Sequence, residues 1–246
     1  FMLYVKHPVS SLASVLKNRG YTGIEGFHPN RANSYNRNVV YPLLGLEPYF
    51  KETAPVELLT LRNLATDASV YRNLLFFYEK AREESKAPFF FYTMTIQNHS
   101  EYNKPGFDSI VRATGLRKSY GEVDQFLSLC KVSDEALEEL VLSVSAFEEP
   151  TVLLFMGDHQ PKLPEGFYQE IQKGNVYDTG FEKTYWKYNV NCYIWANFDL
   201  QEESFPSMTS MNYMQVNLLR LIGATLTPFQ EYLCDLQQKV PVFGQY

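Results

Sequence analysis

The side chains best suited to chemistry follow directly after an apolar run. Val152–Met156 is entirely apolar, and Gly157, Asp158 and His159 come next, with Pro161 close behind. A carboxylate and an imidazole side by side provide one oxygen and one nitrogen ligand, a combination that suits Mn²⁺ or Zn²⁺. Neighbouring side chains on a strand point to opposite faces, so a shared ion requires a turn, which Gly157 and Pro161 favour. The alternative is structural: Asp158 caps the turn and His159 is a surface residue.

Two other segments carry polar side chains of the catalytic type. His99 lies in TIQNHSEY, where an imidazole can act as a general acid or base or form a hydrogen bond to an anionic substrate. The segment FHPNRANSYNRNVVYPLLG contains Arg37, whose planar guanidinium can grip a phosphate or sulfate, and Tyr35, which can form an aromatic wall. The structural alternatives are a loop histidine in the first case and a solvated loop with turn-forming Asn and Pro in the second.

Buried strands must position these residues, because apolar, β-favouring runs precede them. We predict strands at Tyr21–Phe27, Phe89–Thr95, Val152–Met156 and Tyr188–Trp195. Helical periodicity predicts a first helix between a Ser10 or Ser11 cap and Gly20, and further helices over residues 67–85, over 133–147 with Ser133 as the N-cap, and over 210–224.

The alternation of helices with buried strands favours an α/β fold: a three-layer sandwich with a largely parallel central sheet and helices on both faces. In such sheets, ligands bind beyond the carboxyl ends of the strands. Three candidate positions fall at such ends, namely His28, Asn98–His99 and Asp158–His159. The sequence therefore predicts one site at this edge of the sheet.

Composition and absent motifs narrow the function classes. The chain has 246 residues and a formal net charge of -6 with no long basic run, which argues against a nucleic-acid partner. Neither a repeat nor a Gly/Ser linker interrupts it, so we predict one domain over residues 1–246. The motifs GxSxG, HExxH, CxxC, Walker A and GxGxxG are absent, so serine-hydrolase and nucleotide-cofactor functions lack their usual support.

Several ordered segments resemble the extracellular domain of lipoteichoic acid synthases. They are HPVSSLASVLKNRGY, FHPNRANSYNRNVVYPLLGLEPYF, FFFYTMTIQNHSEY, FLSLCKVSDEAL, FMGDHQP and YIWANFDL. These synthases are phosphoglycerol transferases of the alkaline phosphatase/sulfatase superfamily. The resemblance implies an α/β sandwich of that type and a membrane-anchored parent protein. It also implies cell-envelope polymer synthesis at the extracellular face of the bacterial cell membrane.

The resemblance also implies a mechanism and site residues. A threonine, activated by one Mn²⁺ or Mg²⁺, attacks the phosphate of a phosphatidylglycerol-like lipid, and a polyol-phosphate acceptor then takes the phosphoglycerol group. Asp158 and His159 match the metal ligands of the family's GDH motif. His99 and Arg37 match substrate-binding positions, and Tyr35 stands where the family often has Trp.

The family's nucleophilic Thr and metal-binding Glu lie upstream of the segment that resembles HPVSSLASVL. We therefore expect the nucleophilic Thr to lie upstream of Phe1, so that no residue of this sequence is assigned as the catalytic nucleophile. We also expect the sequence to lack the N-terminal part of the catalytic domain, and the chain alone to be inactive and to bind metal weakly or not at all.

Two alternatives to the transferase stay open. One is a sulfatase or phosphodiesterase of the same superfamily, in which the same metal ligands would serve hydrolysis. The other is a non-catalytic module that binds envelope polymers, with the Gly157–Asp158–His159 turn in a purely structural role.

Overall fold

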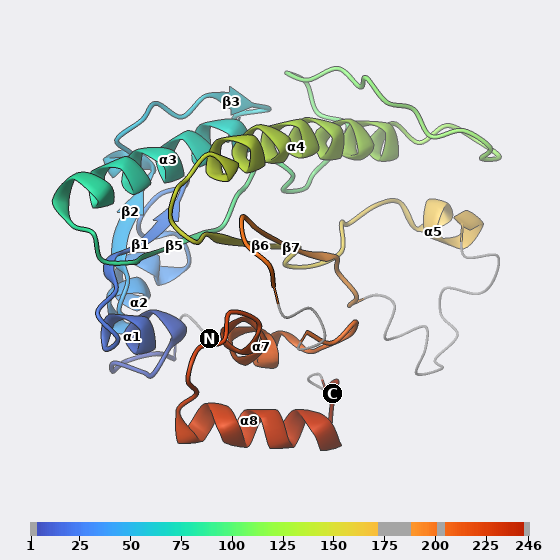
Figure 1. Cartoon of the computed structure of the whole chain (residues 1–246). Coiled ribbons are helices and arrows are strands. Elements are labelled where there is room, and N and C mark those ends of the chain that lie inside the picture. Colours follow the sequence, from blue (N-terminus) through green and yellow to red (C-terminus); the bar gives the residue numbers. More distant parts are fainter. Residues whose placement is uncertain (1–3, 172–187, 201–204, 244–246) are drawn as a thin grey trace. The chain divides into compact units, whose positions relative to one another are not determined.

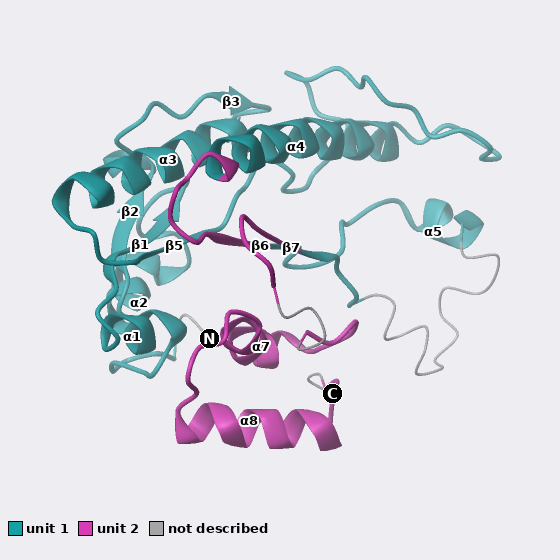
Figure 2. Ribbon diagram, in the orientation of Figure 1, with its two compact units in different colours: residues 1–144, 155–193 teal, residues 145–154, 194–246 magenta. Residues whose placement is uncertain are grey.

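The structure is a computed structural model that describes residues 4–171, 188–200 and 205–243. Its elements follow the chain in this order (Figure 1): α1 Leu12–Lys17, β1 Thr22–His28, η1 Ser34–Asn36, α2 Arg37–Leu43, β2 Glu47–Phe50, η2 Lys51–Thr53, β3 Thr60–Leu61, β4 Leu64–Ala65, α3 Asp67–Glu84, β5 Phe89–Thr93, α4 Gly121–Ser145, β6 Val152–Met156, α5 Glu165–Ile171, β7 Cys192–Ala196, η4 Met211–Tyr213, α7 Met214–Leu221 and α8 Pro228–Lys239. The chain divides into two compact units, residues 1–144 with 155–193 and residues 145–154 with 194–246 (Figure 2).

A parallel sheet of order β2-β1-β5 forms the centre of the first unit. β1 pairs in parallel with both neighbours, so the carboxyl ends of the three strands lie at one edge. The predicted strands match β1, β5 and β6 to within two residues at each end, and the predicted strand at Tyr188–Trp195 is the shorter β7.

Helices cover both faces of this sheet, as the α/β prediction requires. On one face, Phe77 of α3 packs against Phe27 of β1 and Phe91 of β5, with ring centroids 6.5 and 5.5 Å apart. On the other face, Tyr41 of α2 packs edge-on against Tyr92 of β5 at 6.1 Å. Because Phe91 and Tyr92 are neighbours on a strand, they point to opposite faces and each anchors a different helix. Figure 1 shows α2 and α3 on opposite sides of the strands.

The predicted N-cap at Ser133 is wrong. The helix begins at Gly121, and Ser133 lies buried in its middle. The first half of α4 escaped prediction because its buried face includes Asp124, Gln125 and Ser128, which break the apolar stripe. These side chains are buried because they form hydrogen bonds to a neighbouring loop.

The expected loop around Arg37 is partly helical. Residues 34–36 form a 3-10 turn, and α2 begins at Arg37. Sequence patterns did not predict this helix for two reasons. Tyr35 and Asn36 adopt left-handed φ values of 55° and 58° just before it, and Pro42 lies inside it. Val40 and Tyr41 supply the apolar face that holds α2 on the sheet.

The remaining strands form two separate pairs, β3 with β4 and β6 with β7. β6 and β7 are antiparallel, because Gly157 N donates to Asn191 O at one end and Asn197 N donates to Thr151 O at the other, at 3.1 and 3.2 Å. In the second unit, α7 and α8 lie against each other, and the Tyr213 hydroxyl donates to the Val240 carbonyl at 2.8 Å. Among the described residues, no helix is both long and apolar enough to cross a bilayer.

Candidate functional site

Asp158 and His159 lie in the turn after β6, with their side chains exposed to solvent. The Oδ2 atom of Asp158 is 3.4 Å from the Nε2 atom of His159. The Nδ1 atom of His159 lies 2.9 Å from the Gln160 carbonyl, so Nδ1–H donates there and Nε2 keeps its lone pair in the neutral ring. Two ligands of one tetrahedral ion with bonds near 2.1 Å lie about 3.4 Å apart. The pair therefore has the spacing of two ligands of one cation.

Gly157 allows this turn to form. A Cβ atom at residue 157 would lie only 3.2 Å from Cβ of Val190, a tighter contact than side chains normally make. The chain before β7 thus packs directly against the Gly157 backbone, which also donates to Asn191. This close approach of two backbones explains why glycine precedes Asp158.

Within the described residues, no group of three or more His, Cys, Asp and Glu side chains could hold a metal ion. Asp158 and His159 fit such an ion as two of its ligands, by donor type and by spacing.

The nucleophilic Thr is expected upstream of Phe1, and Phe1 itself lies outside the residues that the structure describes. That expectation therefore stays a prediction. The candidate site is built here from metal-binding and substrate-binding side chains, and no residue is assigned as its nucleophile.

Arg37 and Tyr35 are brought together at the start of α2. The Cζ atom of Arg37 lies 4.9 Å from the centroid of the Tyr35 ring, within the range of a cation–π interaction. The Tyr35 ring is 72% exposed, whereas Arg37 is 6% exposed. Arg37 donates from Nη1 to the Ser34 carbonyl at 3.0 Å, across the left-handed turn of Tyr35 and Asn36. The turn thus folds the exposed ring back over the buried guanidinium.

Buried His28 and half-buried Tyr92 both lie within range of the charge of Arg37. His28 is the last residue of β1, is 1% exposed and has no partner for Nδ1 among the described residues. The pKa of His28 is lowered to about 3, mainly by burial and secondarily by the positive charge of Arg37. The imidazole is therefore neutral at physiological pH. No carboxylate within the described ranges forms an ion pair with Arg37.

Tyr92 lies within electrostatic range of both Arg37 and Asp158. Its pKa is raised mainly by burial, while the charge of Arg37 lowers it and the charge of Asp158 raises it. Asp158 also helps to raise the pKa of Tyr102, which reaches about 12, chiefly through burial. Asp158 therefore lies within electrostatic range of β5 and of the loop after it. β6 pairs with β7 and not with β1 or β5, so the single site expected at one sheet edge stays a prediction.

His99 lies on that loop and is exposed. Its Nδ1 atom is 2.6 Å from the Ser100 carbonyl, so Nδ1–H donates and Nε2 is the free nitrogen of the neutral ring. The Tyr102 hydroxyl donates to the Asn98 carbonyl at 2.9 Å, so Tyr102 contacts the His99 loop. The charge of Asp158 also contributes to the raised pKa of Tyr102.

A buried network that sequence reasoning missed fixes this loop. The Ser133 hydroxyl of α4 donates to Oδ2 of Asp67 at 2.6 Å and accepts from the side-chain amides of Gln97 and Asn98 at 3.0 and 2.9 Å. The backbone N–H of Asp67 donates to Oε1 of Gln97 at 3.1 Å. Gln97 and Asn98, which precede His99 in the chain, are thus anchored to α3 and α4.

Arg62 supports the same loop from the other side and was also missed. Its guanidinium donates to the carbonyls of Gln97 and Glu101 at 2.7 Å and to that of His99 at 3.2 Å. Arg62 and Asn63 form the two-residue turn between β3 and β4, both with positive φ. An Arg-Asn pair between two short apolar runs is a weak hairpin signal, and it was the one available clue.

The model of the Sulfatase family matches residues 4–224 of the sequence. The chain belongs to the sulfatase family. Its α/β fold is shared by three solved structures. The phosphoglycerol transferase GacH of Streptococcus pyogenes, solved with sn-glycerol-1-phosphate, matches with a TM-score of 0.67 and 22% identity over 95% of this chain and 61% of that one. The lipoteichoic acid synthase LtaP of Listeria monocytogenes matches with a TM-score of 0.61 and 19% identity over 78% of this chain and 47% of that one.

Two further proteins extend the comparison of this sulfatase-family chain. An alkaline phosphatase superfamily protein of Vibrio parahaemolyticus matches with a TM-score of 0.62 and 18% identity over 93% of this chain and 52% of that one. A putative cyclic β-1,2-glucan modification protein of Rhizobium meliloti is 25% identical over 166 residues, which are 66% of this chain and 25% of that protein. The chain thus spans a quarter of the curated relative and about half to three fifths of the solved structures. The resemblance to lipoteichoic acid synthases is confirmed for family and fold.

Proposed function

We propose that the chain is part of the catalytic domain of a metal-dependent phosphoglycerol transferase. The parent protein would take phosphoglycerol from a phosphatidylglycerol-like lipid at the extracellular face of the bacterial membrane, where it is anchored, and pass it to a polyol-phosphate acceptor of the cell envelope. The observation that carries the proposal is the buried guanidinium of Arg37, which has no carboxylate partner among the described residues and lies beneath the exposed ring of Tyr35.

A buried cation without a counter-ion is costly, because it loses its hydration without gaining an ion pair. A bound phosphate offsets that cost, since its oxygens accept two parallel hydrogen bonds from the guanidinium fork. Neutral His28 beside Arg37 adds no competing positive charge, as its pKa is about 3. The Tyr35 ring forms a wall of the same subsite, suited to the carbon skeleton of a glycerol group.

Asp158 and His159 would hold the divalent ion, Mn²⁺ or Mg²⁺, through Oδ2 and Nε2. When bound, such an ion neutralises charge on the phosphate and lowers the pKa of a hydroxyl nucleophile. His99 would hold a proton at Nε2 when protonated, and there it can donate to a phosphate oxygen or to the departing alkoxide. The nucleophilic Thr implied by the family has no counterpart among the residues assigned to this site.

The names of the matched proteins support this assignment. GacH is a phosphoglycerol transferase solved with sn-glycerol-1-phosphate, and LtaP is a lipoteichoic acid synthase. The name of the Rhizobium meliloti relative specifies modification of a cyclic β-1,2-glucan, which favours a polysaccharide as a second candidate acceptor.

The test uses the full-length protein with phosphatidylglycerol labelled in its glycerol headgroup, in the presence of Mn²⁺. We expect diacylglycerol to be released and the label to move to a polyol-phosphate or glucan acceptor, and Asp158→Asn to abolish both. Label released only to water would favour a phosphodiesterase. Turnover of an aryl sulfate instead would favour a sulfatase, and polymer binding without any turnover would favour a non-catalytic module.

A further inference from the structure

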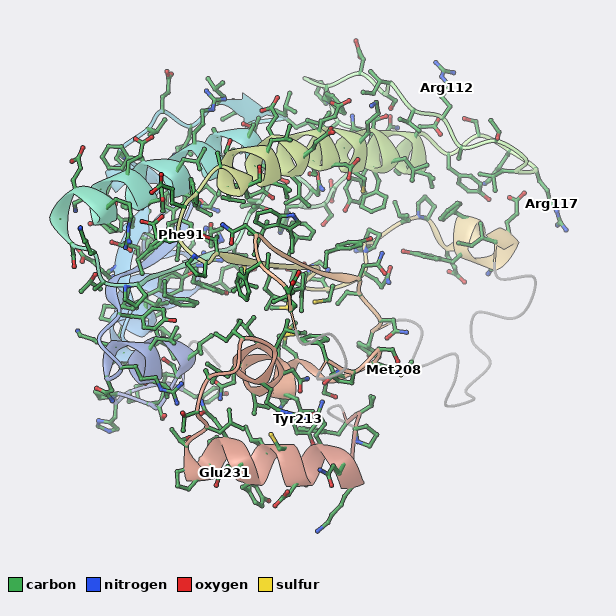
Figure 3. The ribbon with its side chains drawn as sticks, in the orientation of Figure 1. Phe91, Arg112, Arg117, Met208, Tyr213 and Glu231 are labelled. Carbon is green, nitrogen blue, oxygen red and sulfur yellow. The ribbon has the colours of Figure 1, made fainter. Side chains whose placement is uncertain are left out.

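Residues 104–118, here called the basic arm, join the His99 loop to α4. They contain four basic side chains (Lys104, Arg112, Arg117 and Lys118) against a single acidic one, Asp108, in a chain whose formal net charge is -6. All four basic residues are exposed. Figure 3 shows Arg112 and Arg117 projecting outward from this segment. The arm is therefore a local concentration of positive charge on an acidic protein.

Side chains of α4 fix the backbone of the arm. Gln125 accepts from Lys104 N at 3.0 Å and donates to the carbonyls of Lys104 and Phe107 at 2.8 and 2.9 Å. The Ser128 hydroxyl accepts from the N–H groups of Ile110 and Val111 at 2.9 and 2.8 Å.

Asp124 completes this row, because its Oδ1 atom accepts from Ala113 N at 2.9 Å. Asp124, Gln125 and Ser128 are all buried, so their side chains form hydrogen bonds with the backbone of the arm and not with solvent. An irregular segment with its backbone held in this way presents its own side chains outward in a defined arrangement.

The far end of the arm is tied to α5, which follows the Asp158–His159 turn in the chain. Glu170 of α5 accepts from Arg117 N and from the Tyr120 hydroxyl, and the rings of Tyr120 and Phe167 lie 5.8 Å apart. At the near end, Asp158 influences Tyr102, just before the arm. The far end of the arm is attached to α5, the first helix after the candidate metal ligands.

The charges of the arm are largely uncompensated. Lys104 is paired with Glu101 at 2.7 Å, and the Lys118 ammonium lies 5.0 Å from the centroid of the Tyr120 ring. Across the described parts of the chain, no carboxylate forms an ion pair with Arg112, Arg117 or Lys118. Their charge is available to a partner.

We propose that the basic arm is a docking track for a polyanionic phosphodiester chain, which binds along it with one end at the candidate site. The identity of that chain as the polyol-phosphate acceptor rests on the proposed function. Positive charges spaced along an extended segment suit a row of phosphates, whereas a single phosphate is better held by groups that converge on one point. Binding of such a polymer releases counterions and weakens as salt rises.

The test measures equilibrium binding of a purified glycerol-phosphate polymer to the full-length protein at several salt concentrations. The variant carries Arg112→Gln, Arg117→Gln and Lys118→Gln together. A matched control carries Lys6→Gln, Lys17→Gln and Lys86→Gln, which remove the same charge from exposed positions outside the arm. We expect the arm variant to bind the polymer about tenfold more weakly with a flatter salt dependence, and the control to bind as the wild type does.

Wild-type polymer binding by the arm variant, or an equal loss in the control, overturns the inference. So does arm-dependent binding to phosphatidylglycerol vesicles that the polymer does not compete away, which indicates a membrane surface as the partner. An uncharged glucan that binds through the arm as tightly as the polymer also overturns it. Transfer to free glycerol, measured separately, should be unchanged in the arm variant. If no transfer occurs in the wild type but the polymer still binds through the arm, the proposed function fails and the docking track stands.

Discussion

The guanidinium of Arg37 lies beneath the ring of Tyr35, with its Cζ atom 4.9 Å from the ring centroid. The ring is exposed and the guanidinium is buried, so the role of each residue can be tested with its own variants. Tyr35→Ala should leave stability unchanged and raise KM for the lipid about fivefold, because one cation–π contact and one wall of the subsite are lost. Tyr35→Phe keeps the ring and should behave as the wild type. An equal effect of both variants would assign the role to the hydroxyl group instead.

Arg37→Lys should lower kcat/KM about 100-fold, because an ammonium cannot reproduce the two parallel hydrogen bonds of the guanidinium fork. The fold should tolerate the change, since Arg37 has no ion-pair partner to lose among the described residues. Steady-state kinetics and thermal unfolding, measured on the same preparation, separate the two effects. A fall in activity that tracks a fall in Tm would show a structural role.

Asp158→Asn and His159→Ala should each weaken Mn²⁺ binding by the full-length protein and reduce transfer on the order of 10³-fold. Each removes one of the two proposed ligands, whose Oδ2 and Nε2 atoms lie 3.4 Å apart. Titration calorimetry with Mn²⁺ checks the binding, and Asp108→Asn on the arm serves as the matched control. Unchanged Mn²⁺ affinity in both variants would place the ion elsewhere.

Ser133→Ala should destabilise the protein by about 1 to 3 kcal/mol, because Asp67 and the side-chain amides of Gln97 and Asn98 each lose a hydrogen bond to the buried hydroxyl. It should also lower kcat, since the His99 loop loses its anchor. Ser143→Ala is the control on the same helix, where the hydroxyl donates only to the carbonyl of Glu139. Urea unfolding of both variants gives the comparison, and equal destabilisation would deny the network its role.

Glu25 should make stability depend on pH near neutrality. Its pKa is raised from 4.5 to about 7, first by burial and then by the charge of Glu47, its partner across β1 and β2. Because the folded-state pKa exceeds the unfolded value, the contribution of Glu25 to the stability of the folded state is largest below pH 4.5. That stability is lost as the pH rises through 7.

Glu25→Gln should therefore stabilise the protein above pH 7, by at most about 3 kcal/mol, and flatten the profile of unfolding free energy against pH. Glu57→Gln, at an exposed position, is the control and should change neither. Chemical unfolding at a series of pH values gives both profiles, and parallel curves for wild type and Glu25→Gln would contradict the expectation.

Sequence patterns predicted β5 and β6 well because both are continuous runs of apolar and β-favouring residues. They failed for the start of α4 and for α2. In α4, buried Gln125 and Ser128 serve loop backbone, so their burial follows from tertiary hydrogen bonds that no local pattern encodes. In α2, two left-handed residues precede the helix, and Asn but not Tyr is a usual choice for such φ values.

The candidate site was predictable in its chemically distinctive members and not in the residues that support them. Asp158, His159, His99, Arg37 and Tyr35 were all identified as candidates from residue type and spacing, and their roles remain predictions. Asp67, Ser133 and Arg62 were invisible because their meaning depends on partners more than 30 residues away in the chain. Long-range polar contacts of this kind appear only once the elements are assembled.

The attachment of the basic arm to α4 separates two kinds of sequence position. Asp124, Gln125 and Ser128 hold backbone atoms of the arm, which every residue type except proline can offer in full. Arg112 and Arg117 contribute nothing to that attachment through their side chains. Point mutations can therefore change the charge of the arm without disturbing its attachment to α4. Related proteins that serve polymers of different charge should differ at the outward positions of the arm and agree at the three helix positions beneath it.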